Sequence, residues 1–360
     1  MRTEIHLELY LVFGVQGFIM RYTLTRWFLS LPGSWLLRMS GQPQMTASGG
    51  RVFDPAGQFV VVNALKQGIF ALDDTKSAAE LRAIWKKQMK PFEKRPLRGI
   101  HRQDRTISVD GGSITVAEFR PKAVQPGGPA VVYFHGGGYS SMGIDSCRSL
   151  CEYFAKELNV KVYAVGYRLA PEYPYPTQLN DANTALDWVR ANASELEIDT
   201  ERISVAGDSA GGNLTAVLCL KRRDNGEWLP KAQLMVYPFI DYTFSHPSIE
   251  ELGEGHIITK THLEWFKSNL LQDESLEKDP YVSPLFAPNL SGLPPAIVIT
   301  AGFDLLRDEA KAYADRLSED GVETQYKEFM TEGHGFMYAD TTASVRAANA
   351  SIVTMFKPLL

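Results

Sequence analysis

The sequence predicts an α/β protein with a mostly parallel central sheet flanked by helices. Three observations lead to this prediction. Apolar runs of strand length alternate with stretches of helix length from residue 106 to the end of the chain. Two glycine clusters directly follow two of the apolar runs. The chain has 360 residues, 44% of them hydrophobic, which is enough to bury one large core.

The first predicted element is a β-hairpin. Residues 106–109 and 114–119 are rich in strand-forming side chains and flank Asp110-Gly111-Gly112, so they predict an antiparallel edge of the sheet. Further strands are predicted at 130–134, 161–165, 203–206, 232–236, 296–301 and 323–329. Helices are predicted between and after them, near 146–157, 178–193, 210–222, 308–320 and 342–357. This alternation is typical of parallel strands joined by helical crossovers.

The most informative motif is Gly-Asp-Ser-Ala-Gly at residues 207–211. It follows the strand predicted at 203–206 and leads into a helix, so Ser209 lies at the apex of a sharp turn. Such a turn strains the backbone at the serine and leaves no room for side chains at 207 and 211. Gly-x-Ser-x-Gly in this setting is the nucleophile elbow of an α/β-hydrolase. A Gly/Ser-rich loop met by chance is the alternative.

A second glycine cluster, His-Gly-Gly-Gly-Tyr at residues 135–139, follows the apolar run 130–134. Backbone amides without side chains in the way can bind the negative charge of a tetrahedral intermediate. We expect such donors at Gly136, at Gly137 and at Ala210, the last at the positive end of a helix. No Gly-Lys-Ser/Thr follows the cluster, which argues against a phosphate cradle. His135 is expected to shape this loop by hydrogen bonding.

The fold requires a base downstream of the serine, and two histidines qualify. His334, in Glu-Gly-His-Gly-Phe, follows the alternating residues 323–329 and is expected at the carboxyl edge of the sheet. An imidazole can take up and return a proton near neutral pH. His256 lies in an irregular region and is expected to face the substrate or to be structural.

An acid is expected between the serine and the histidine. Asp304 projects from the loop after the strand at 296–301, so we expect it to orient the imidazole. Asp308 is the second candidate, because a carboxylate at the start of the next helix is favoured by the helix dipole alone. Asp208, beside the serine, is the third.

The motifs together carry a family resemblance. The chain closely resembles the hormone-sensitive-lipase-like esterases (bacterial family IV) of the α/β-hydrolase superfamily, from about residue 100 to the end. The motifs are His135-Gly136-Gly137-Gly138, Tyr167-Arg168-Leu169-Ala170-Pro171-Glu172, Gly207-Asp208-Ser209-Ala210-Gly211-Gly212-Asn213, Asp304-Leu305-Leu306-Arg307-Asp308-Glu309 and Gly333-His334-Gly335-Phe336. Family members commonly have proline after the catalytic aspartate, where this chain has Leu305.

The resemblance implies a carboxylesterase that acts on short- to medium-chain acyl esters through an acyl-enzyme, without a metal or an organic cofactor. It implies a catalytic triad of Ser209, Asp304 and His334, and an oxyanion hole of Gly136, Gly137 and Ala210. A non-catalytic small-molecule receptor on the same fold is the rival from another class. Lactonase, amidase and true lipase are rivals within catalysis, because all share the acyl-enzyme chemistry.

The resemblance also implies a helical cap over the active site. Residues 1–95 precede the predicted sheet, and residues 240–285 interrupt the alternation within the catalytic domain, 96–360. In the family both segments contribute to the cap, which excludes water and shapes the acyl pocket. Aromatic side chains are expected as pocket walls on position alone: Tyr139, Phe239, Trp265 and Phe336.

Composition restricts the partners. A net charge of −5 with a pI near 5.9 argues against nucleic acid as a partner. The resemblance implies a small-molecule ester as the substrate. The odd count of three cysteines indicates no disulfide framework. Cys147 and Cys151 are one helical turn apart and are interpreted as buried thiols. A cytoplasmic location is expected, and a homodimer is left open.

The first 45 residues allow three interpretations. Residues 9–20 are apolar but shorter than the roughly 20 residues needed to span a bilayer. Glu4 and Glu8 and the lack of a small-residue cleavage site argue against a signal peptide. The first expectation is cap helices that are apolar enough to face the substrate, and the second is an interfacial helix that contacts a membrane or lipid droplets. The third is a start codon placed too early, with Met20, Met39 or Met45 as the true start.

Overall fold

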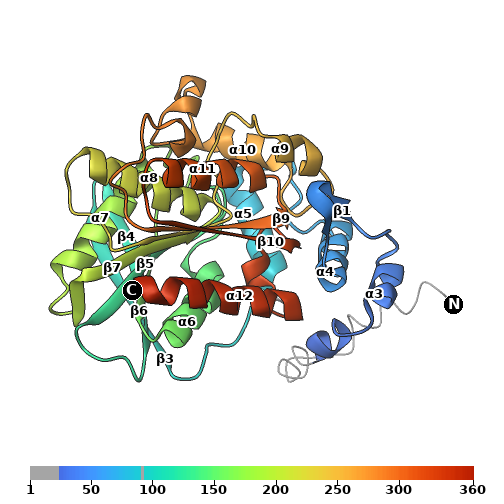
Figure 1. Ribbon diagram of the computed structural model, residues 1–360, viewed down its shortest axis with the longest axis horizontal. Helices are drawn as coiled ribbons and strands as arrows, with labels where there is room; N and C mark the ends of the chain where they lie inside the picture. Colours follow the sequence, from blue (N-terminus) through green and yellow to red (C-terminus); the bar gives the residue numbers. More distant parts are fainter. Residues whose placement is uncertain (1–23, 91–92) are drawn as a thin grey trace.

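The computed structural model describes residues 24–90 and 93–360, and its centre is an eight-stranded sheet (Figure 1). The strand order is β10-β9-β8-β7-β5-β6-β4-β3. β3 (Ile100–Val109) and β4 (Gly112–Pro121) form an antiparallel hairpin, and β4 pairs antiparallel with β6 (Lys161–Gly166). All other neighbours in this sheet are parallel: β5 (Gly128–Phe134), β7 (Ile198–Asp208), β8 (Gln233–Val236), β9 (Ala296–Phe303) and β10 (Thr324–Gly333). The predicted mostly parallel sheet with an antiparallel edge is confirmed.

Helices cover both faces of the sheet, as predicted. In Figure 1, α8 (Ala210–Asp224) and α11 (Arg307–Glu319) lie above the sheet, and α6 (Ile144–Leu158) and α12 (Ala343–Phe356) lie below it. α7 (Thr177–Ala191) shares its buried core with α8.

Two strands begin earlier than their apolar runs suggest. β3 starts at Ile100, ahead of the predicted residue 106, and β7 starts at Ile198, ahead of residue 203. The added stretches are largely polar. β3 is an edge strand with one side open to solvent, so polar side chains are tolerated there. In β7 the pairing with β5 shifts register across the polar stretch.

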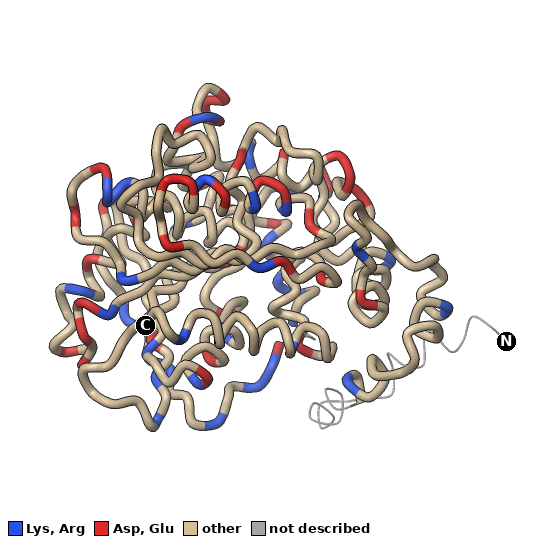
Figure 2. Tube along the Cα trace, viewed as in Figure 1, with Lys and Arg blue, Asp and Glu red and all other residues tan. Residues whose placement is uncertain are grey.

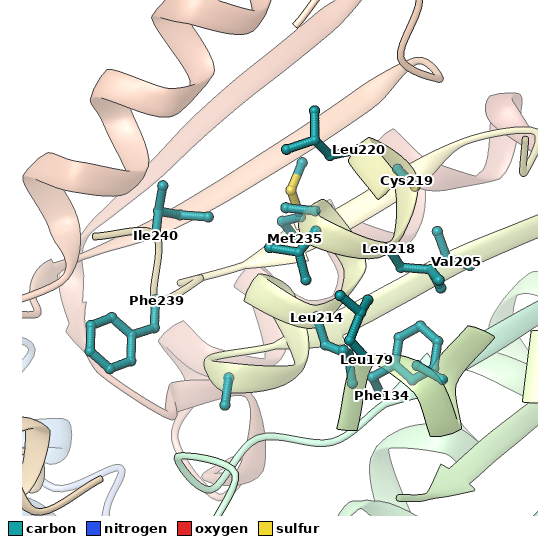
Figure 3. Packing of buried hydrophobic residues seen from close by; sticks show 14 of the residues in the cluster. Phe134, Leu179, Val205, Leu214, Leu218, Cys219, Leu220, Met235, Phe239 and Ile240 are labelled. Carbon is teal, nitrogen blue, oxygen red and sulfur yellow. The ribbon is translucent and has the colours of Figure 1, made fainter. Parts of the chain in front are cut away.

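The position of β5 in the sheet explains why its apolar residues do not alternate with polar ones. Val131 and Tyr133 belong to the core between the sheet and helices α6 and α12. Val132 and Phe134 belong to the core on the α7/α8 side, where Figure 3 shows Phe134 close to Leu179 and Leu214. Successive residues of a strand point to opposite faces, so a strand covered by helices on both sides has only apolar positions.

The two segments outside the alternation are mainly helical. Between β8 and β9 lie α9 (Pro247–Leu252), α10 (Lys260–Leu270) and the short 3₁₀ turns Glu274–Lys278 and Pro284–Phe286. Before the large sheet lie a helical turn at residues 24–28, α3 (Gly33–Ser40), a small ribbon of β1 (Thr46–Ala47) and β2 (Arg51–Val52), α4 (Pro55–Lys66) and α5 (Ala78–Met89). A 3₁₀ turn at Ser48–Gly50 joins β1 to β2, and further 3₁₀ turns lie at Phe336–Tyr338 and Lys357–Leu359.

Candidate active site

Ser209 lies on the strand–turn–helix that its motif predicts. β7 ends at Asp208 and α8 begins at Ala210, and Ser209 between them has φ 55° and ψ −121°. A Cβ added at Gly207 would lie 2.2 Å from the carbonyl oxygen of Gly211. One added at Gly211 would lie 2.0 Å from the carbonyl oxygen of Phe134. The close approach of strand and helix therefore excludes side chains at both glycines.

A chain of hydrogen bonds joins Ser209 to a histidine and a carboxylate. His334 Nε2 lies 3.0 Å from Ser209 Oγ, and His334 Nδ1 lies 2.8 Å from Asp304 Oδ2. The sheet topology explains why Asp304 and His334 lie close together. Asp304 follows β9 and His334 follows β10, and neighbouring parallel strands have their carboxyl ends at the same edge of the sheet. The Asp304 side chain is fully buried and that of His334 is 9% exposed. An imidazole with its proton on Nδ1 offers Nε2 as an acceptor for the serine hydroxyl.

The two rival acids have other partners. Asp308 accepts a hydrogen bond from the Ser248 amide at 3.0 Å and pairs with Arg307 at 2.7 Å. Asp208 accepts from the hydroxyls of Tyr133 at 2.7 Å and Tyr338 at 3.1 Å. Within the described ranges, neither carboxylate has a hydrogen bond to His334. Burial raises the pKa of Asp208, an effect that these hydroxyls oppose.

The structure corrects the expectation for Gly136. Its amide donates to Asp208 Oδ1 at 3.1 Å, so this N–H is already used to hold the loop against the elbow. The next two amides, of Gly137 and Gly138, have no acceptor in the part of the chain that the structure describes. Both residues have positive φ, 107° and 59°. Gly137 is among the donors expected from the sequence, whereas Gly138 is not.

A side chain of α10 lies directly on this loop. A Cβ added at Gly138 would fall 2.2 Å from ring atoms of Phe266, and one at Gly137 would fall 2.4 Å from the carbonyl oxygen of Ser141. Contact of backbone with an aromatic ring therefore explains the glycine at 138. The neighbouring Trp265, expected as a pocket wall, packs edge-on against Trp85 of α5 with centroids 5.5 Å apart, and its role as a wall stays a prediction.

Two of the expected wall residues belong to the core. Phe239 is 1% exposed and stacks on Tyr242 with ring centroids 4.0 Å apart. Phe336 packs against Tyr237 and Phe329 in the core on the α6/α12 side of the sheet. Both rings thus pack against other aromatic side chains, and their role as pocket walls stays a prediction.

Tyr139 links the glycine loop to α8. Its hydroxyl donates to Asn213 Oδ1 at 2.6 Å, and Asn213 Nδ2 donates to the carbonyls of Phe239 at 2.6 Å and Val282 at 2.9 Å. Tyr139 also lines a small pocket with Asn213 and Gln178. The buried side-chain amide of Asn213 thus ties together the glycine loop, α8 and the segment before β9.

The imidazole of His135 is buried beneath the glycine loop. It stacks on Tyr167 with ring centroids 4.2 Å apart, and its Nδ1 donates to the Gly136 carbonyl at 2.7 Å. Burial lowers the pKa of His135 to about 4, because the charged form loses its hydration. His256 lies beside the stacked rings of Phe53 and Phe303, with ring centroids 6.4 and 6.2 Å away, and burial lowers its pKa as well.

We expect His135 to make folding sensitive to mild acid. The folded state keeps the imidazole neutral, whereas the unfolded chain protonates it near pH 6.5. The contribution of His135 to the free energy of unfolding is therefore complete above pH 6.5. It is lost as the pH falls from 6.5 towards 4, which lowers the free energy of unfolding by about 3 kcal/mol in all. Urea unfolding at a series of pH values measures this loss. His135→Gln should reduce the pH dependence, and an unchanged slope would contradict the assignment.

Sheet, elbow and hydrogen-bonded side chains define the class of protein. Residues 131–338 match the sequence model of a protein family described as having the alpha/beta hydrolase fold. The chain belongs to this family and, within it, to the hormone-sensitive-lipase-like esterases. It is thereby an enzyme of the carboxylic ester hydrolase class.

Three proteins illustrate the similarity. The chain is 35% identical over 302 residues to the carboxylic ester hydrolase LipN of Mycobacterium tuberculosis, covering 80% of this chain and 78% of LipN. It is 37% identical over 231 residues to an ethyl acetate hydrolase of Pseudomonas putida, covering 63% and 73%. The crystal structure of the carboxylesterase EstE1, cloned from a metagenomic library, has a TM-score of 0.76 at 36% identity and covers 80% of this chain and 99% of EstE1.

Proposed function

We propose that this protein hydrolyses short- to medium-chain carboxylic esters through an acyl-enzyme, with Ser209 as nucleophile. His334 is the general base and acid, and Asp304 orients its imidazole. The observation that carries the proposal is the continuous hydrogen-bond chain from the serine hydroxyl through both ring nitrogens to a buried carboxylate, with links of 3.0 and 2.8 Å.

The reaction follows from this geometry. His334 Nε2 accepts the Ser209 proton as the oxygen attacks the ester carbonyl, and the buried Asp304 carboxylate stabilises the imidazolium. The tetrahedral intermediate collapses as His334 returns the proton to the departing alcohol. Water then attacks the acyl-enzyme with the same base, and the carboxylic acid and free Ser209 are released.

The developing oxyanion is proposed to be bound by the amides of Gly137, Gly138 and Ala210. The first two are unpaired within the described residues, and the third lies at the first position of α8, where the helix dipole is positive. Asp208 is a positioning residue in this scheme, because it anchors the Gly136 amide and so fixes the loop.

We further propose that residues 1–95 and 240–285 form a cap over the site, beside the catalytic domain 96–360. Contacts between the described parts of these segments support this. Trp85 packs on Trp265, and His262 Nε2 bonds to the Phe70 carbonyl at 2.8 Å. Phe266 lies on Gly138 of the glycine loop. Such a cover would exclude water from the acyl-enzyme.

Initial rates over nitrophenyl esters from acetyl to palmitoyl test the substrate class. We expect a maximum at short chains, in line with the relative that is named an ethyl acetate hydrolase. A maximum at long chains with interfacial activation would instead indicate a true lipase. Faster turnover of lactones or amides in a parallel panel would reassign the substrate. No turnover of any acyl compound would favour a small-molecule receptor.

A further inference from the structure

The described N-terminal segment exposes large apolar side chains. Trp27 is 65% exposed and Trp35 is 62% exposed, with Leu24 at 40% and Met39 at 37%. We call these four residues the N-terminal apolar surface. The other four tryptophans of the chain, Trp85, Trp188, Trp228 and Trp265, are buried or half-buried. Two exposed indoles this close in sequence are unusual for a surface in contact with water alone.

The packing of the same segment does not use these side chains. Leu29 and Leu36 form a small core with Ala56 of α4. On α3, Trp35 and Met39 are one turn apart and exposed, whereas Leu36 and Ser40 are buried. Figure 1 shows α3 beside α4, away from the large sheet. The helix therefore has one apolar side packed on the protein and a second that faces outward.

The stretch of sequence that carries this surface is basic, although Arg51 at its end pairs with Glu328. Residues 9–53 contain four arginines, at 21, 26, 38 and 51, and no aspartate, glutamate or lysine, in a protein of net charge −5. Arg26 and Arg38 are exposed among the apolar residues. In Figure 2 the helical turn at 24–28 and α3 show basic and uncharged residues without acidic ones.

We propose that the N-terminal apolar surface binds to the face of a lipid bilayer that contains anionic lipids. Indole rings prefer the boundary between headgroups and acyl chains, and exposed arginines beside them attract anionic headgroups. α3 has eight residues, about 12 Å of helix, so it lies on the bilayer and does not cross it. No helix within 24–90 or 93–360 is long and apolar enough to cross a membrane.

A second copy of the chain is the rival occupant. In a two-fold interface this patch would face itself, which brings the exposed Arg38 of both copies together without a carboxylate from residues 9–53. Like charges placed opposite each other disfavour such an interface, whereas an anionic surface compensates them. The charge pattern therefore favours lipid over self-association.

Vesicle sedimentation with the full-length protein tests the proposal. We expect binding to vesicles of phosphatidylcholine with phosphatidylglycerol, at least tenfold weaker binding to phosphatidylcholine alone, and weakening by salt. The double variant Trp27→Ser/Trp35→Ser, and separately Arg26→Gln/Arg38→Gln, should each bind at least tenfold more weakly. Met330→Ser removes an apolar side chain that is 45% exposed on β10 and should bind like the parent. Circular dichroism and thermal unfolding establish that each variant is folded.

Tryptophan fluorescence supplies a second readout. Because Trp27 and Trp35 are the exposed indoles, their emission should shift to the blue and be quenched by brominated lipids when vesicles are added. Absence of vesicle binding at every composition would overturn the proposal, as would equal binding to neutral and anionic vesicles. A dimer that the tryptophan variant dissociates, without vesicle binding, would assign the surface to a second copy. Indoles already protected from acrylamide in vesicle-free solution would mean that the chain itself covers them.

Discussion

Ser209→Ala is expected to lower kcat for ester hydrolysis by about 10⁴ to 10⁶ fold while leaving the fold intact. The variant removes the side-chain oxygen at the apex of the elbow and keeps the backbone. Its hydroxyl makes one side-chain hydrogen bond, to His334 Nε2 at 3.0 Å, so its loss costs stability little. Initial rates on a short nitrophenyl ester, with circular dichroism alongside, measure both effects.

Ser204→Ala is the matched control. Ser204 lies on the same strand, is fully buried, and has no partner for its hydroxyl in the described residues. The same chemical change there should leave kcat within about tenfold of the parent. A folded Ser209→Ala protein that retains ester turnover would show that the hydrolysis does not proceed through this serine.

Asp304→Asn is expected to lower kcat by about 10⁴ fold. The substitution keeps the shape of the side chain but removes the negative charge that stabilises the imidazolium. An amide can also present a donor to His334 Nδ1, which would place the ring proton on Nε2 and block proton transfer from the serine. The measurement is kcat and kcat/KM on a short ester across neutral pH.

Asp308→Asn and Asp208→Asn are the controls, because they make the same isosteric change at the two rival acids. Asp308 accepts a hydrogen bond from the Ser248 amide and forms an ion pair with Arg307. We therefore expect Asp308→Asn to keep activity within about tenfold of the parent. Asp208→Asn retains an acceptor for the Gly136 amide and should also cost less than the change at Asp304. If Asp308→Asn proved the most damaging of the three, Asp304 would be the wrong acid.

Much of the architecture could be predicted because strand and helix periods are local properties of the sequence. Every strand and helix predicted from residue 106 onward has a counterpart in the structure. The starts of β3 and β7 were missed, since polar residues enter a strand when an open edge or a shift in pairing accommodates them. Apolar pattern alone carries no information about which strand is at an edge.

The sequence also named Ser209, Asp304 and His334, whose catalytic roles remain predictions for the variants above. Each lies in a motif directly after a strand, and parallel strands present such positions at one edge. Asp304 could be preferred over Asp308 because the latter lies inside the first turn of α11. Their distances needed the structure, which places the three side chains within hydrogen-bonding range.

The sequence by itself determined the class of fold, the elbow and the order of the reactive residues, because these depend on local pattern and on glycines that no other residue can replace. Only the tertiary structure decided which amides of the glycine loop are free. Asp208, 72 positions along the chain, engages Gly136 and leaves Gly137 and Gly138 available. It also decided that Phe239 and Phe336 are core residues while Phe266 reaches the loop. Such choices depend on which surfaces meet across the sheet, and that is a property of the packed chain.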